Sequence, residues 1–249
     1  MSPLLSIKGL TLRRDDGTGS AILNDFSMDV EEGEVVIIKG ESGSGKTTLL
    51  KCIAELNVYQ SGEILLHDKK TTSYGIPTYR TLVQYIPQRP SLLPGTPLDL
   101  LETIRSFSSR KSSKSKSTST SGIDGEDDSN DDLDPMRLAS EWGIQRTLWT
   151  REWATLSGGE GQRIALALGI GIGGAEVVLL DEPTSALDAE TMKKVENSLL
   201  SLLPPLKTQP STSNGVRRRG IGPKAYVWIT HEAAQAERCG TRTVDITRR

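Results

Sequence analysis

A glycine-rich stretch at residues 40–48, GESGSGKTT, has the clearest chemistry in the chain. Glycine lacks a Cβ and adopts positive φ angles, so such a loop can curl until successive backbone N–H groups point at one anion. An apolar run at residues 35–38 precedes the loop. A helix-forming segment follows it and adds the positive end of a helix dipole. Strand, loop and helix in this order predict a phosphate-binding loop rather than a chance match.

The side chains of this loop extend the phosphate site to a whole nucleotide. Lys46 is expected to reach the β- and γ-phosphates, and the hydroxyl of Thr47 is placed to ligate Mg²⁺. The predicted nucleotide-binding residues of the loop are Gly40, Glu41, Ser42, Gly43, Ser44, Gly45, Lys46, Thr47 and Thr48.

A second apolar run, residues 177–180, is followed directly by two acids, Asp181 and Glu182. Ligands bind at the carboxyl ends of parallel strands, so these carboxylates are expected beside the phosphates. Asp181 is suited to hold Mg²⁺, directly or through water, and Glu182 to polarise the water that attacks the γ-phosphate. The alternative is an ordinary acidic junction between strand and loop, which the phosphate loop makes less favourable.

These segments, with four others, resemble the nucleotide-binding subunit of an ATP-binding cassette (ABC) protein over nearly the whole chain. The loop resembles the Walker A motif, and VVLLDE at residues 177–182 resembles Walker B. The other matches are the Q-loop glutamine Gln88, the ABC signature Ser157, Gly158, Gly159 and Glu160, the D-loop ending in Asp188, and the switch histidine His231. Six elements in the family's order exclude most other P-loop enzymes, such as small GTPases, helicases and kinases.

The resemblance implies roles for these residues, with ATP and Mg²⁺ as substrate and cofactor. Glu182, His231 and Gln88 would be catalytic, and Thr47, Gln88 and Asp181 would hold Mg²⁺. The signature residues would begin a helix whose free N–H groups face the γ-phosphate bound by a second cassette. Gly161 departs from the longer polar side chain that is usual after the signature.

A second departure concerns the base of the nucleotide. The family stacks adenine on an aromatic residue shortly before the second strand, and Arg14 falls at that position. Its planar guanidinium can stack on a base, which makes Arg14 a predicted ATP-binding residue. The alternative stays open: Arg14 only extends into solvent at the edge of the protein, and the base is weakly held.

Alternating apolar runs and helical patterns predict an α/β fold: a P-loop NTPase core with a mainly parallel sheet. A small antiparallel β subdomain would begin the chain, with strands at residues 6–12 and 26–30. An α-helical signature subdomain would follow Gln88, with helices at 98–105 and 136–142, the second capped by Asp134. The whole chain, 1–249, is expected to be one ABC ATPase domain, its core at about 1–88 and 165–249 and its helical subdomain at about 89–164.

Two segments interrupt this pattern. Residues 108–132 are rich in serine and acids, have almost no apolar side chains, and are expected to be disordered. They read either as a solvated insertion or as a regulatory loop sensitive to phosphorylation. The second insertion, 204–223, contains three consecutive arginines and reads as a basic surface loop, with a nucleic-acid or targeting role as the alternative.

Composition favours a soluble subunit. The formal net charge is −2, which favours neither nucleic acid nor an acidic membrane as a partner, so no nucleic acid is expected. No apolar run approaches the length that spans a bilayer, and the first residues lack the pattern of a secretory leader. Two cysteines, Cys52 and Cys239, suit a reducing compartment. The expected location is cytoplasmic, peripheral on the cytosolic face of a membrane through a partner.

The resemblance therefore implies an ATPase (ATP + H₂O to ADP + phosphate) that powers an ABC transporter through nucleotide-dependent dimerisation. Its partners would be a second cassette, identical or different, and a separate transmembrane permease subunit. A lone cassette of this kind is similar to iron-export and plant aluminium-tolerance cassettes. The alternative is a soluble, non-transport ABC ATPase that acts as a clamp or regulator. Soluble ABC proteins of the translation type usually join two cassettes in one chain, and only one set of motifs is present here. ABC ATPases of the chromosome type need a long coiled coil, and no sustained heptad pattern appears.

Overall fold

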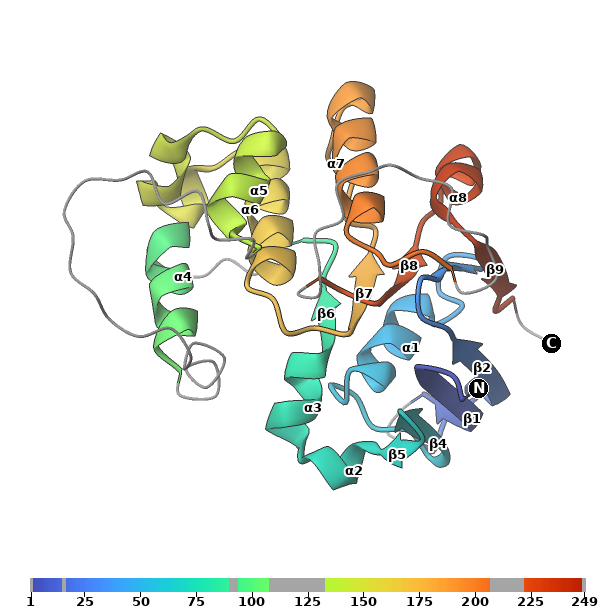
Figure 1. Ribbon diagram of the computed structural model, residues 1–249. Coiled ribbons are helices and arrows are strands. Elements are labelled where there is room, and N and C mark those ends of the chain that lie inside the picture. The colour runs from blue at the N-terminus through green and yellow to red at the C-terminus, as the bar shows by residue number, and fades with distance from the viewer. Residues whose placement is uncertain (1, 15–16, 90–93, 108–132, 207–221, 248–249) are drawn as a thin grey trace. The chain divides into compact units, whose positions relative to one another are not determined.

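The computed structural model describes residues 2–14, 17–89, 94–107, 133–206 and 222–247 (Figure 1). The chain divides into two compact units, one formed by residues 1–88 and 173–249, the other by residues 89–172. The serine-rich segment 108–132 and most of the second insertion, 204–223, lie outside the described residues.

A five-stranded parallel sheet forms the centre of the first unit, in the order β6-β7-β8-β3-β9. All residues of β7 and β8 are buried, as expected of parallel strands covered on both faces. The edge strand β9 is polar and mostly exposed, which explains why the apolar pattern does not reveal it. The strands are β3 (Val35–Lys39), β6 (Val83–Ile86), β7 (Val177–Asp181), β8 (Ala225–Ile229) and β9 (Arg242–Asp245).

An antiparallel sheet in the order β2-β1-β4-β5 is the second sheet of this unit. Its strands are β1 (Leu5–Arg13), β2 (Ala21–Val30), β4 (Ser61–Leu66) and β5 (Lys69–Lys70). A Cβ on Gly62 would lie 2.7 Å from the carbonyl oxygen of Gly9, so glycine allows β4 to approach β1 there. His67 and Asp68 form the β4–β5 turn with φ of 49° and 59°, the left-handed pair typical of a two-residue hairpin.

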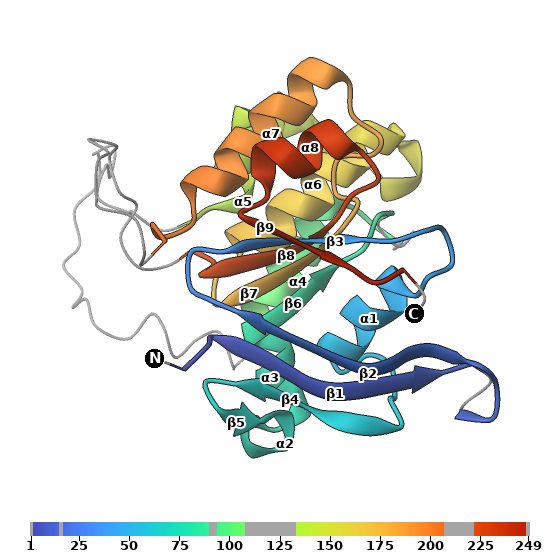
Figure 2. The same ribbon diagram turned by 90° about the vertical axis from the view of Figure 1, so that its right-hand side faces the viewer.

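Helices cover both faces of the parallel sheet. Figure 2 shows α7 (Ala189–Ser201) and α8 (Ala233–Cys239) on one face and α1 (Lys46–Ile53) on the other, with the antiparallel sheet beyond α1. Buried side chains of α1, β3, β7, β8 and the antiparallel sheet form one apolar core. Two short helices, α2 (Thr71–Tyr74) and α3 (Ile76–Leu82), lead into β6. This core holds the carboxyl ends of the parallel strands in fixed positions.

The second unit is helical. It contains α4 (Pro97–Ser106), α5 (Pro135–Glu141), α6 (Gly158–Gly171) and two 3-10 segments, η3 (Arg146–Thr150) and η4 (Trp153–Thr155). The Asp134 side chain accepts a bond from the N–H of Arg137, and Pro135 follows it, as the sequence predicts for the start of α5. A Cβ on Gly171 would lie 2.6 Å from the Cα of Pro135, so glycine lets α6 pack closely against α5.

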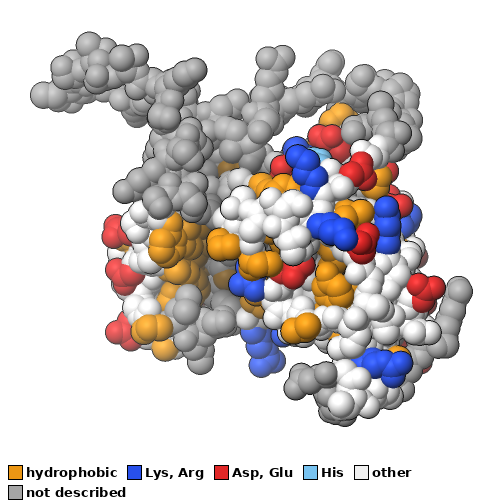
Figure 3. Space-filling view, turned by 90° about the horizontal axis from the view of Figure 1, so that it is seen from below, with side chains coloured by type: hydrophobic (Ala, Val, Ile, Leu, Met, Phe, Trp, Pro, Cys, Tyr) orange, Lys and Arg blue, Asp and Glu red, His pale blue; other side chains and the backbone are white. Residues whose placement is uncertain are grey.

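Charged side chains on the face drawn in Figure 3 are mixed in sign. Figure 3 shows basic and acidic side chains beside each other, with apolar side chains between them. In the part of the chain that the structure describes, no helix has the length and apolar character to cross a membrane.

Candidate nucleotide site

The glycine-rich loop connects β3 to α1, and its geometry requires glycine. Gly43 and Gly45 have φ of 78° and 97°, and Gly45 is the residue that precedes α1. A Cβ on Gly45 would lie only 2.2 Å from Cγ2 of Ile22. The Lys46 ammonium donates to the carbonyl oxygens of Gly40 at 2.8 Å and Glu41 at 2.9 Å. Lys46 is therefore folded over its own loop, where it is only 6% exposed.

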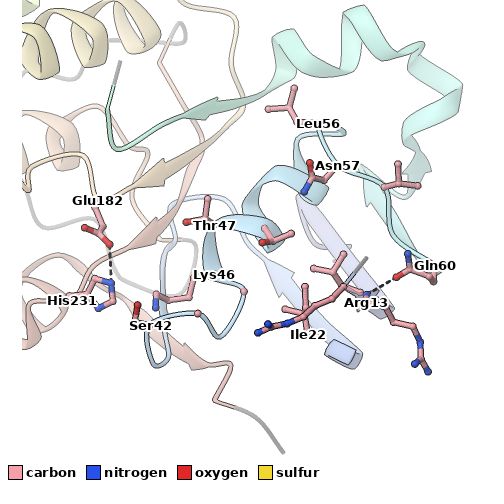
Figure 4. Close-up of a pocket in the computed structure, with 16 residues that line it drawn as sticks. Arg13, Ile22, Ser42, Lys46, Thr47, Leu56, Asn57, Gln60, Glu182 and His231 are labelled. Carbon is pink, nitrogen blue, oxygen red and sulfur yellow. Dashed lines mark hydrogen bonds and ion pairs between the residues drawn. The ribbon is translucent and has the colours of Figure 1, made fainter. Parts of the chain in front are cut away.

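A cavity of about 920 Å³ extends from this loop across the first unit. Figure 4 shows Glu182 and His231 at one end, Lys46 and Thr47 in the middle, and Arg13, Leu56 and Gln60 at the other end. A volume of this size accommodates a nucleotide. The lining residues are Leu12, Arg13, Arg14, Ile22, Ser42, Gly43, Gly45, Lys46, Thr47, Thr48, Leu56, Asn57, Val58, Gln60, Glu182 and His231.

Asp181 ends β7 with a buried carboxylate that accepts two hydroxyl groups. The Thr47 hydroxyl donates to Oδ1 at 3.3 Å, and the Tyr85 hydroxyl donates to Oδ2 at 2.8 Å. Burial raises the pKa of Tyr85, and the bond to Asp181 raises it further, so this phenol stays protonated and remains a donor. Tyr85 thus restrains the carboxylate from the neighbouring strand β6.

Glu182 carries the next carboxylate, and segments from distant parts of the sequence converge on it. Gln88 Nε2 donates to its Oε2 at 2.7 Å, and His231 Nε2 lies 2.9 Å from its Oε1. The Glu182 backbone has φ of 47°, a left-handed conformation that is costly for a residue with a side chain. Such strain is concentrated at functional sites. Its N–H donates to the carbonyl of Ile229 at 3.1 Å, which holds this conformation in place.

The donor set suits Mg²⁺, a hard cation that prefers oxygen ligands. Mg²⁺ in phosphate sites keeps several waters and uses one or two carboxylates together with substrate oxygens. The Thr47 hydroxyl beside the Asp181 carboxylate meets that need. Among the described residues, no group of three or more His, Cys, Asp or Glu side chains could hold a metal by itself. Ser44 Oγ is buried without a partner in the described structure, as expected of a hydroxyl that serves a bound phosphate.

The signature residues lie in the second unit, at the start of α6. Ser157 Oγ accepts from the N–H of Glu160 at 3.3 Å, and Glu160 Oε2 accepts from the N–H of Ser157 at 2.8 Å, which forms a capping box. These bonds hold the pKa of Glu160 below its usual value. The box leaves the N–H groups of Gly158 and Gly159 without partners inside the helix. In the first unit, Asp188 caps α7 through the N–H groups of Glu190 and Thr191.

The structure brings most of the predicted first-unit residues to the cavity. Arg14, Ser42, Gly43, Gly45, Lys46, Thr47, Thr48, Glu182 and His231 line it. Gly40, Glu41 and Ser44 belong to the same loop, and Gln88 and Asp181 bond to lining residues.

Sequence reasoning missed Tyr85 and the lining residues of the far end, namely Arg13, Ile22, Leu56, Asn57, Val58 and Gln60. A hydroxyl-bearing residue at the carboxyl end of a strand, three residues before Gln88, was the available signal for Tyr85. No such signal marks the loop after α1.

A family model described as "ABC transporter" matches residues 23–185. The lactococcin-A transport/processing ATP-binding protein LcnC of Lactococcus lactis subsp. lactis is 32% identical over 80% of this chain, which spans 27% of that relative's length. The probable iron export ATP-binding protein FetA of Escherichia coli is 30% identical, over 93% of this chain and 86% of its own. A solved dimer, the ATP-binding cassette MJ0796 bound to ADP and Pi after hydrolysis, has a TM-score of 0.72 at 25% identity, over 97% of this chain and 93% of its own.

These likenesses confirm the predicted P-loop α/β fold with its antiparallel and helical parts. The family model covers the phosphate loop, Gln88, the signature, Asp181 and Glu182, whereas Asp188 of the D-loop and His231 lie beyond the matched range. The chain belongs to the ABC transporter family of ATP-binding cassettes.

Proposed function

We propose that this chain hydrolyses ATP and powers a transporter as its nucleotide-binding subunit. The observation that carries the proposal is the convergence of Gln88 and His231 on the Glu182 carboxylate, at the end of the cavity that begins at the phosphate loop. Phosphoryl transfer depends mainly on positioning and charge stabilisation, and hydrolysis also needs a group that orients water. Lys46, which would stabilise charge, and Glu182, which would orient water, line the same cavity, and this supports the proposal.

The catalytic sequence follows from these groups. When ATP binds, Lys46 exchanges the carbonyls of Gly40 and Glu41 for phosphate oxygens, and backbone N–H groups of the loop donate to the same anion. Thr47, Asp181 and Gln88 would hold Mg²⁺, which would supply charge neutralisation. Glu182 orients a water molecule and accepts its proton as the water oxygen bonds to the γ-phosphorus. The bond to the β-phosphate oxygen breaks, and ADP and phosphate result.

His231 and the second cassette complete the proposed site. His231 would donate to the γ-phosphate while it still orients Glu182. The N–H groups of Gly158 and Gly159, with the hydroxyl of Ser157, would bind the γ-phosphate held by a second cassette, identical or different. The dimeric state of the solved relative that holds ADP and Pi supports this arrangement. The cassettes would act on the cytosolic face of a membrane through a permease subunit.

The test is Glu182→Gln, which keeps the size of the side chain and removes the base. The wild-type protein should hydrolyse ATP with Mg²⁺, and the variant should bind ATP but turn over at least about 100-fold more slowly. It should elute as a dimer with ATP in size-exclusion chromatography. Glu237→Gln, on the exposed surface of α8, is the matched control. A monomeric Glu182→Gln protein with wild-type turnover would refute the proposal.

The transport role has a separate test. Affinity purification of the tagged chain from detergent-solubilised membranes should recover a polytopic membrane protein, which would then define substrate and direction. An active ATPase that is recovered only from the soluble fraction, without such a partner, would instead favour a non-transport clamp or regulator.

A further inference from the structure

A buried amide joins the segment after Glu182 to the helix that follows His231. Gln235, in the first turn of α8, is 3% exposed, and its Nε2 donates to Oγ1 of Thr184 at 2.8 Å. The same nitrogen donates to Oε1 of Glu196 in α7, also at 2.8 Å. Because an ionised carboxylate only accepts hydrogen bonds, the amide must present its nitrogen here and cannot turn over. The bond to Thr184 therefore has one fixed orientation.

Burial makes these bonds a firmer restraint than the contact between Glu182 and His231 themselves. Thr184 and Glu196 are both 2% exposed, so water cannot replace a partner that either of them loses. In the pair between His231 and Glu182, by contrast, the His231 side chain is 53% exposed and that of Glu182 is 21% exposed. Pairs that reach solvent contribute little by themselves. The buried bonds nearby are thus the stronger support for the position of these two groups.

Short connections carry this restraint to both side chains. Only Pro183 separates Thr184 from Glu182, and the proline ring fixes one backbone angle of that connection. On the other side, α8 begins two residues after His231 and contains Gln235. A helix moves as a unit, so a shift of its first turn also displaces the residue that immediately precedes it. The bond between Thr184 and Gln235 therefore restrains the separation of Glu182 from His231.

We infer that Gln235 is a positioning residue, which holds Glu182 and His231 at hydrogen-bond distance through its bond to Thr184. The inference rests on the proposed function, since it concerns the water and the phosphate that these two groups would contact. Neither Gln235 nor Thr184 is among the described residues that line the cavity. Loss of their bond should therefore slow the chemical step without weakening ATP binding. A displacement of about 1 Å at a reacting centre can lower a rate about 100-fold.

The first experiment breaks this bond from either side. Gln235→Leu removes the amide donors with little change in size, whereas Thr184→Val removes one hydroxyl and leaves the bond between Gln235 and Glu196 in place. Each variant should lower kcat for ATP hydrolysis at least about tenfold and leave the KM for ATP unchanged. Thr184→Ser keeps the hydroxyl and should restore kcat. The matched control is Asn197→Ala, which removes an exposed amide beside Glu196 on α7.

The second experiment observes the His231 ring directly, in untagged protein without nucleotide. The chain has two histidines, so the carbon–proton NMR spectrum of labelled imidazole groups contains two Cε1 signals, which His67→Gln assigns. Thr184→Val and Gln235→Leu should shift or broaden the signal of His231. The signal of His67, which lies in the β4–β5 turn, should stay in place because that turn is remote from the bond.

Thr184→Val decides the positioning role, because it is the milder change. An unchanged kcat, or an unchanged His231 signal, in this variant would overturn the inference. So would a rise in the KM for ATP as large as the fall in kcat, or equal shifts of both ring signals, since either result indicates a general structural change. Failure of the proposed function looks different: the wild-type protein would hydrolyse no ATP, while the ring spectra would still show whether the bond between Thr184 and Gln235 positions His231.

Discussion

The hydroxyl of Tyr85 is a single group whose removal should alter metal binding without altering the phosphate loop. It donates to Asp181 Oδ2 at 2.8 Å, on the oxygen opposite the one that accepts from Thr47. A donor outside the metal shell orients the ligand and tunes its affinity for the metal. Tyr85 is thus a positioning residue for Asp181.

Tyr85→Phe deletes only this hydroxyl. We expect Mn²⁺ to bind the ATP-loaded protein about tenfold more weakly, as measured by electron paramagnetic resonance, while ATP affinity without metal stays unchanged. The Mg²⁺ concentration that half-saturates hydrolysis should rise in parallel. Tyr74→Phe is the control, because the Tyr74 hydroxyl donates to the carbonyl of Leu66, away from the site. Equal metal affinities in the wild-type protein and Tyr85→Phe would contradict the positioning role.

For single residues, type and spacing predict the side chains that belong to a motif. They do not predict side chains whose contacts depend on how two strands pair. The motifs predict a role for Lys46, Thr47, Asp181 and Glu182, because each of these residue types has one evident use beside a phosphate. Tyr85 reaches Asp181 because β6 pairs with β7 so that Tyr85 lies opposite Leu179, two residues before the acid. Alternation along one strand contains no information about its partner's register.

Carboxylate caps fix the starts of several helices and make their stability depend on pH. Asp99 forms a capping box with Thr96 at the start of α4, where Oδ2 accepts the Thr96 N–H at 2.8 Å. Bonds from the Thr96 backbone and hydroxyl hold the pKa of Asp99 below its usual value. Because the unfolded chain lacks these bonds, ionised Asp99 stabilises the fold at neutral pH. That contribution is lost as pH falls through the folded-state pKa.

Asp99→Asn keeps an acceptor oxygen for the Thr96 N–H but removes the titration. The free energy of unfolding of the wild-type protein should therefore fall more steeply than that of the variant between about pH 5 and pH 3. Urea unfolding followed by circular dichroism at several pH values measures both slopes. Parallel curves would show that the cap does not contribute to the acid sensitivity.

Helices and strands can be predicted where their sequence pattern is long. Short or polar elements are missed, because they leave no clear pattern in the sequence. The buried runs of β3 and β7 and the Asp134 cap of α5 all match the sequence expectation. The four-residue helix α2 and the two-residue strand β5 are too short for any periodicity. β9 has no apolar run, and it exists because its backbone pairs with β3.

At the scale of the molecule, buried polar side chains join segments that are distant in sequence. Glu196 of α7 is only 2% exposed, and it accepts two bonds from the Arg238 guanidinium and one from Gln235 of α8. Gln235 also donates to Thr184, two residues after Glu182. This network connects the segment after Glu182 to the helix after His231. Local patterns cannot predict it, since each member is an ordinary polar residue in its own helix or loop.

Glu196→Ala removes the acceptor and leaves the Gln235 amide buried without it. We expect the free energy of unfolding to fall by about 2–3 kcal/mol, at the low end for a broken buried pair because Arg238 is partly exposed and can be hydrated. Lys194→Ala, which breaks the exposed pair between Lys194 and Glu190 on the same helix, should leave the free energy of unfolding nearly unchanged. Chemical denaturation compares the two variants, and similar losses would mean that burial does not strengthen the network.

The strand order also has a consequence for how the protein is made. The strand that carries the phosphate loop, β3, lies between β8 and β9, which come near the other end of the described chain. A ribosome therefore releases the loop long before either neighbour of β3 exists, and both edges of the nascent strand stay open to chaperones or to other chains. The cavity lacks one of its lining residues until His231 has been added. A translation product that stopped before residue 225 would contain the whole GESGSGKTT segment and still lack β8 and β9, the two strands that flank β3.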